Sequence, residues 1–129
     1  MTSVVVFASK TGNTRYVAEQ ISGKMAADII DLGKEDADLS KYDEVVIGSG
    51  VYAGKLSKKI RSFLDENKDT LSEKKVSFYL CCVFKDEKGQ KQLDGLMSKY
   101  AFISKKVFFS GKKKGPDAAV EIEEFVKSL

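Results

Sequence analysis

The sequence predicts an α/β fold, a three-layer α/β/α sandwich built around a five-stranded parallel sheet. Segments rich in Val, Ile and Phe alternate with segments in which apolar residues recur at helical spacing. The apolar runs are continuous rather than alternating, which is typical of strands that are covered on both faces. The chain has 129 residues and no internal repeat or linker, so we expect one domain over residues 1–129.

Each element follows from one of these two patterns. The run Val4–Phe7 predicts the first strand, and Val17, Ile21 and Met25 then fall on one face of a helix. Further strands are expected at residues 29–32, 45–47, 76–84 and 107–109. Further helices are expected at residues 56–64, 93–100 and 116–129, with Pro116 in a first turn. Five such strands are compatible with either doubly wound order, and in both the ligand lies beyond the carboxyl ends of the strands, where the strand order reverses.

The composition excludes several function classes. The chain has no histidine, so it lacks the usual imidazole base and the commonest transition-metal ligand. Its two cysteines, Cys81 and Cys82, are adjacent, which argues against a disulfide between them and gives no zinc spacing. We assign no catalytic or metal-binding residue, interpret the cysteines as small buried residues, and expect a cytoplasmic protein. A net charge of +3 does not indicate nucleic acid, and no apolar run is long enough for an integral membrane segment.

The segment between the first strand and the first helix predicts an anion-binding turn. It is rich in small hydrogen-bonding groups, and its single glycine lets the backbone bend closely around a tetrahedral group. The amides that open a helix lack intrahelical acceptors and lie at its positive end, so phosphate is the natural ligand. The predicted residues are Ser9, Lys10, Thr11, Gly12, Asn13 and Thr14.

Other phosphate-binding designs fit these residues less well. A Walker loop needs GxxxxGK[ST], which is missing, and a dinucleotide-binding turn needs three glycines where this one has a single glycine, although Asp31 is suitably placed. A tyrosine phosphatase needs a cysteine where Ser9 stands, six residues before Arg15. A receiver domain needs acidic residues where Ser9 and Ser49 stand.

The stretch SKTGNT, residues 9–14, resembles the phosphate loop of the flavodoxins, Ser/Thr-x-Thr-Gly-Asn-Thr. Length and element order also resemble a short-chain flavodoxin. The resemblance implies the strand order 2-1-3-4-5 and binding of the 5′-phosphate of FMN by hydroxyls and amides, without a required cation.

The resemblance also implies two further ligand segments. The segment after the third strand would cover one face of the flavin ring, with Tyr52 stacking on it, and a peptide at Ala53 or Gly54 would lie beside the flavin N5. The segment after the fourth strand would supply main-chain contacts and an apolar wall, although the family's acidic, aromatic motif is absent there. The implied residues are Ser49, Gly50, Val51, Tyr52, Ala53, Gly54, Cys82, Val83 and Phe84.

Charge distinguishes this chain from carriers with an acidic flavin rim. Lys10, Lys55, Lys85 and Lys88 all fall in the predicted ligand segments. Because positive charge favours an anionic reduced flavin, we expect a higher reduction potential than that of acidic flavodoxins.

Three functions remain open at this point. The first is an FMN-binding electron carrier that serves one or more unidentified redox partner proteins. The second is an FMN-dependent oxidoreductase resembling menaquinone-dependent protoporphyrinogen oxidase, although only a short segment follows the fourth strand here. The third is a non-redox domain that binds phosphate or a regulatory partner, and failure to take up FMN would favour it.

Overall fold

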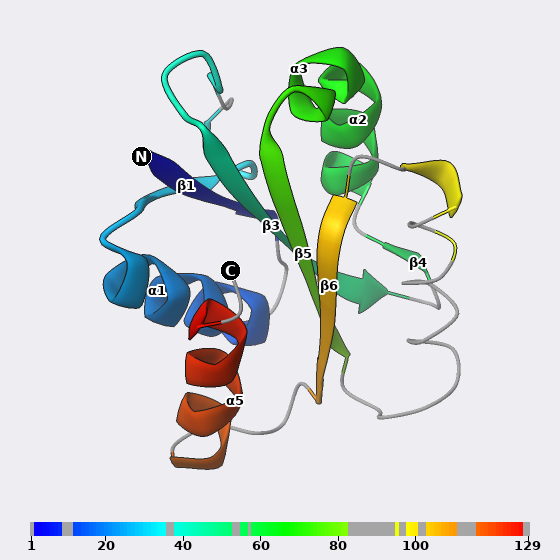
Figure 1. Cartoon of the computed structure of the whole chain (residues 1–129). Coiled ribbons are helices and arrows are strands. Elements are labelled where there is room, and N and C mark those ends of the chain that lie inside the picture. The colour runs from blue at the N-terminus through cyan, green and yellow to red at the C-terminus, as the bar shows by residue number, and fades with distance from the viewer. Residues whose placement is uncertain are drawn as a thin grey trace.

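The computed structural model describes residues 2–8, 12–35, 38–52, 55–56, 58–82, 95, 98–100, 103–110 and 116–127. The elements, shown in Figure 1, are β1 (Ser3–Ala8), α1 (Gly12–Met25), β2 (Asp28–Asp31), β3 (Glu44–Tyr52), β4 (Lys55–Leu56), α2 (Lys58–Glu66), α3 (Lys68–Ser72), β5 (Lys75–Cys82), β6 (Ile103–Ser110) and α5 (Pro116–Lys127). The predicted strands and helices that the structure describes follow one another in the predicted order, β4 and α3 are additional elements, and α5 begins at Pro116.

The main sheet is parallel and has the order β2-β1-β3-β5-β6. Apart from the two-residue β4, this is the predicted flavodoxin-like order 2-1-3-4-5, which is confirmed. The chain runs outward from β1 to β2 and then returns to β3 on the other side of β1. The strand order therefore reverses between β1 and β3, where such sheets hold their ligands.

Helices cover both faces of the sheet, and α1 and α5 lie together on one of them (Figure 1). Successive side chains of a strand point to opposite faces. In β1, Val5 and Phe7 pack with Ile21 of α1 and Ile122 of α5. The alternate residues of β1, Val4 and Val6, point to the other face. There they pack in one cluster with Ile60 and Leu64 of α2 and Leu71 of α3.

The third strand differs from the expectation. It continues to Tyr52, well past the predicted end at Ile47, and β4 pairs back on it antiparallel, with Val51 opposite Leu56. Leu56 therefore belongs to β4, and α2 begins only at Lys58. A single apolar residue at a helix boundary fits either period, so its spacing could not distinguish strand from helix.

Two other expectations need comment. Ile29 was expected in a strand covered on both faces, yet it is 39% exposed because β2 forms an edge of the sheet. Most of the helix expected at residues 93–100 lies outside the described residues, although residues 95, 98 and 99 are helical.

Candidate functional site

The predicted anion-binding turn falls between β1 and α1, and its residues 9–11 lie outside the described residues. The strand β1 ends at Ala8 and α1 begins at Gly12, so the free amides and the positive end of α1 lie at the carboxyl end of β1. Ala8 pairs with Ser49 of β3. The start of α1 is therefore next to the point where the strand order reverses.

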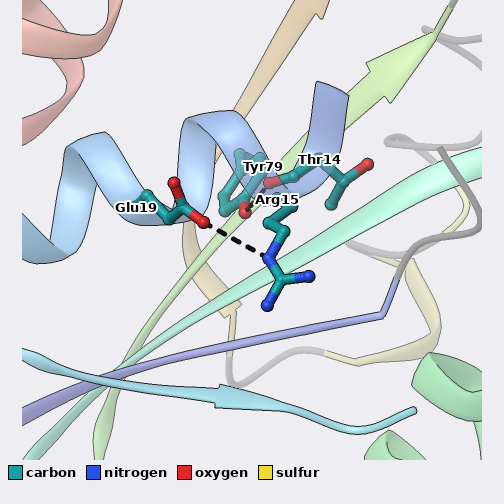
Figure 2. Close-up of polar contacts among 4 residues, drawn as sticks. All are labelled: Thr14, Arg15, Glu19 and Tyr79. Carbon is teal, nitrogen blue, oxygen red and sulfur yellow. Dashed lines mark hydrogen bonds and ion pairs between the residues drawn. The ribbon is translucent and has the colours of Figure 1, made fainter. Parts of the chain in front are cut away.

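Thr14, in the first turn of α1, carries a polar group with no partner. The residue is fully buried, and its Oγ1 forms no hydrogen bond among the residues that the structure describes. Figure 2 shows the Thr14 hydroxyl pointing away from Tyr79. A buried hydroxyl without a partner costs about 1–3 kcal/mol. A ligand with acceptor oxygens at this helix terminus would remove that cost, so the site fits a phosphate group.

The carbonyl of Thr14 is held by the sheet. The Tyr79 hydroxyl of β5 donates a hydrogen bond of 3.0 Å to the Thr14 carbonyl. The Tyr79 ring lies over Gly48, its neighbour in β3, so closely that a Cβ at Gly48 would be 2.1 Å from Tyr79 Cζ. The lack of a side chain at Gly48 therefore makes room for the Tyr79 ring.

Two of the described charged residues near the turn form contacts within the protein. The Arg15 Nε atom lies 3.2 Å from Glu19 Oε1, one turn along α1 (Figure 2). Both side chains are about half exposed, so the pair contributes little to stability. Asp31, the candidate ribose ligand of a dinucleotide site, accepts a hydrogen bond of 2.8 Å from the Gly33 amide and closes the turn after β2.

The second and third predicted segments begin side by side, because the carboxyl ends of β3 and β5 are neighbours in the sheet. Ser49 is fully buried in β3, the strand continues to Tyr52, and Gly50 pairs with Cys81 just before β5 ends at Cys82. The side chains of Gly12, Asn13, Val51, Tyr52 and Cys82 lie outside what the structure describes. Ser9, Lys10, Thr11, Ala53, Gly54, Val83 and Phe84 lie outside the described residues altogether.

Tyr79 and Gly48 are the site residues that sequence reasoning missed. Their contact depends on the register between β3 and β5, which no local pattern reveals. A glycine inside an otherwise apolar strand is nevertheless a signal, because it often marks the close approach of another group.

A groove of about 570 Å³ lies elsewhere, between α2 and the turn after β2. Its lining residues are Leu32, Lys58, Lys59, Ser62, Phe63, Glu66 and Asn67. It contains none of the buried unpaired polar atoms, so we do not place the ligand site there. In the described part of the chain, no three potential metal ligands cluster, and none of the helices has the length and apolar character that crossing a membrane requires.

Comparisons with known proteins agree with this fold. A pneumococcal flavodoxin (Streptococcus pneumoniae TIGR4) superposes with a TM-score of 0.77 at 19% identity, covering 100% of this chain and 97% of the other. A flavoprotein from Lactobacillus acidophilus, solved in complex with FMN, superposes with a TM-score of 0.65 at 15% identity, covering 83% and 91%. At these identities the likeness shows the fold alone.

Sequence comparison shows the family as well as the fold. An uncharacterized protein of Methanocaldococcus jannaschii is 40% identical over 55 residues, a match that covers 42% of this chain and 37% of that protein. The chain thus matches little more than a third of the length of this relative. The family model described as "Flavodoxin domain" matches residues 4–116, which is most of the chain. The chain therefore belongs to the flavodoxin domain family.

Proposed function

We propose that this chain binds FMN and acts as a flavodoxin-like electron-transfer protein. Family membership supports a flavin cofactor, and a neighbour of the same fold is known in complex with FMN. The observation that carries the choice of a phosphorylated flavin is the buried Thr14 hydroxyl, which has no partner and lies at the start of α1. FMN has a phosphate to place there, whereas riboflavin has none.

The residues of the turn would hold the phosphate in two ways. Thr14 would donate its hydroxyl, with Ser9 and Thr11 as further donors, and the first amides of α1 would add backbone donors. Hydrogen bonds to a charged acceptor are stronger than neutral ones, so each donor also fixes the position of the ligand. At the next strand ends, Tyr52 would stack on the ring and Cys82 would lie near its edge.

The bound flavin would supply the redox chemistry, and the protein would supply binding, orientation and electrostatics. This division of roles suits a chain without histidine, in which no imidazole is available for proton transfer. No observation favours a particular organic substrate, so the oxidoreductase alternative is left to experiment. The identity of the redox partners and the cytoplasmic location remain predictions.

The test is direct. The purified protein is incubated with FMN, separated from free flavin, and its visible spectrum is recorded; parallel fluorescence titrations compare FMN with riboflavin. We expect a yellow protein that binds FMN more tightly than riboflavin. When reduced with dithionite, the bound flavin should pass electrons to cytochrome c. A protein that stays colourless would contradict the proposal and favour the non-redox alternative.

A further inference from the structure

We propose that Tyr79 is a positioning residue for the phosphate-binding turn, and that its hydroxyl holds Thr14 in the place where Thr14 can donate to the phosphate. The inference rests on the proposed function and goes beyond it, because Tyr79 belongs to β5 and not to any of the predicted ligand segments. Its role would be to act on the ligand through Thr14.

The ring of Tyr79 is fixed on several sides. It is fully buried, it lies against the backbone of Gly48, and its edge meets Phe125 of α5 with the ring centroids 6.5 Å apart at 67°. Edge-to-face aromatic pairs are favourable and have a defined geometry. The hydroxyl at the end of this fixed ring therefore has little freedom to move.

Thr14 transmits this constraint to the site. The residue carries both the carbonyl that accepts from Tyr79 and the buried hydroxyl that lacks a partner. A β-branched side chain has few allowed χ1 rotamers, so fixing the Thr14 backbone also limits where its hydroxyl can point. Figure 2 shows the Tyr79 hydroxyl approaching the helix backbone from the side of the sheet. The bond joins residues 65 positions apart and ties the first turn of α1 to the middle of the sheet.

The variant Tyr79→Phe tests this role because it removes the hydroxyl and keeps the ring. Its affinities for FMN and for riboflavin are measured by fluorescence titration. Riboflavin has the same ring system without the phosphate, so it reports contacts outside the turn. We expect FMN binding to weaken about three- to tenfold, with riboflavin binding changed by less than about twofold.

Tyr42→Phe is the matched control. Tyr42 is also a buried tyrosine, and its hydroxyl donates to Asp28 Oδ2 at 2.6 Å, at the amino end of the sheet. The two variants lose the same atom, and Tyr42→Phe loses the stronger hydrogen bond because its acceptor is a carboxylate. Tyr42→Phe should leave the ratio of FMN to riboflavin affinity at the wild-type value. A ratio that changes in Tyr79→Phe alone therefore cannot result from a general loss of stability.

The outcomes separate the inference from the proposed function. Wild-type protein that binds no FMN would overturn both. A wild-type protein that binds FMN, together with a Tyr79→Phe variant of unchanged affinity ratio, would overturn this inference alone. Should Tyr79→Phe fail to fold, Phe125→Leu removes the edge contact on the ring and keeps the hydroxyl. In Phe125→Leu, a loss of FMN affinity that is smaller than the one expected for Tyr79→Phe and is not seen with riboflavin would support the role. An unchanged ratio of FMN to riboflavin affinity would contradict it.

Discussion

The two ends of the sheet treat their buried polar groups differently. At the amino end, Glu44 is buried, yet its Oε1 accepts a hydrogen bond of 3.1 Å from Ser3 Oγ, and its Oε2 lies 3.5 Å from Lys75 Nζ. At the same end, Tyr42 donates to Asp28. Glu44 Oε2 forms no hydrogen bond among the described residues, but its charge is balanced by the Lys75 ammonium, so the polar groups at this end are compensated within the protein itself.

At the carboxyl end, the protein leaves a hydroxyl unsatisfied. Thr14 is fully buried and its Oγ1 has no partner, while its carbonyl is held by Tyr79. A buried unpaired hydroxyl alone does not make a site, because Ser77 of β5 has one too. The difference is the setting, since Thr14 lies at a helix terminus that attracts anions and Ser77 lies inside a strand. The comparison supports the carboxyl end as the proposed ligand-binding end.

The largest effect is expected where Tyr79 crosses β3. Gly48→Ala would place a methyl group inside the Tyr79 ring, so the ring must move and the free energy of unfolding should fall by about 3 kcal/mol. Urea unfolding measures the change. Gly23→Ala is the control, because a Cβ at Gly23 meets nothing within 4 Å and should stabilise α1 by up to about 1 kcal/mol. Equal effects at the two glycines would show that Tyr79 does not need the space over Gly48.

Thr14→Val separates binding from stability. It removes the hydroxyl and keeps the shape, so FMN binding should weaken by about 1–3 kcal/mol. The ligand-free protein should be as stable as wild type or more stable, since an unsatisfied polar group is lost. Titration with FMN and urea unfolding without flavin measure the two quantities. Ser77→Ala, which removes the other unpaired hydroxyl, should leave FMN affinity unchanged, and a loss as large as that of Thr14→Val would refute the distinction between the two sites.

At the amino end, Tyr42→Phe should lower the free energy of unfolding by about 1 kcal/mol at neutral pH and leave FMN affinity unchanged. The hydrogen bond to Asp28, helped by burial, raises the pKa of Tyr42 from 10.0 to about 12. The stability that comes from this raised pKa is therefore fully present below pH 10 and is lost as the pH rises toward 12.

Unfolding measured between pH 8 and about 12 should show a shallower alkaline decline in Tyr42→Phe than in wild type. Part of the decline should remain, because burial and the hydrogen bond to Asp65 also raise the pKa of Tyr100 to about 12. Identical pH profiles for the two proteins would exclude this account of Tyr42.

The smallest effect concerns charge near the flavin. Lys55, in β4, pairs with Tyr52 at the end of β3, beside the proposed ring site. Lys55→Glu should lower the flavin reduction potential by an amount on the order of tens of millivolts, since it replaces an attractive charge with a repulsive one. The shift should shrink at high salt, and Lys41→Glu at the amino end should give almost none. A higher potential in Lys55→Glu would contradict the predicted effect of a basic rim.

Much of the fold could be predicted because local patterns determine it. The run Val4–Phe7 is too short and too rich in β-branched residues for a helix, and it proves to be fully covered in the sheet. The place where the anion-binding turn is proposed, between β1 and α1, also follows from local sequence, because the ends of both elements could be predicted from their apolar patterns.

What the sequence could not predict depends on tertiary contacts. The residues around Gly48 do not predict its contact with Tyr79, 31 residues later, because that contact depends on the register of β3 with β5. Likewise, the burial of Thr14 depends on how α1 packs on the sheet, and the exposure of Ile29 depends on the place of β2 at the edge of the sheet. Leu56 lies in β4 and not in the predicted helix, because a single apolar residue cannot show whether the spacing is that of a strand or of a helix.

The most direct test of the central claim is a crystal structure of this protein with FMN, and the quantity to measure is the distance from Thr14 Oγ1 to the nearest phosphate oxygen. We predict a hydrogen bond of about 2.5–2.8 Å, with the phosphate at the start of α1. A phosphate bound elsewhere, or a Thr14 hydroxyl still unpaired in the complex, would contradict the account.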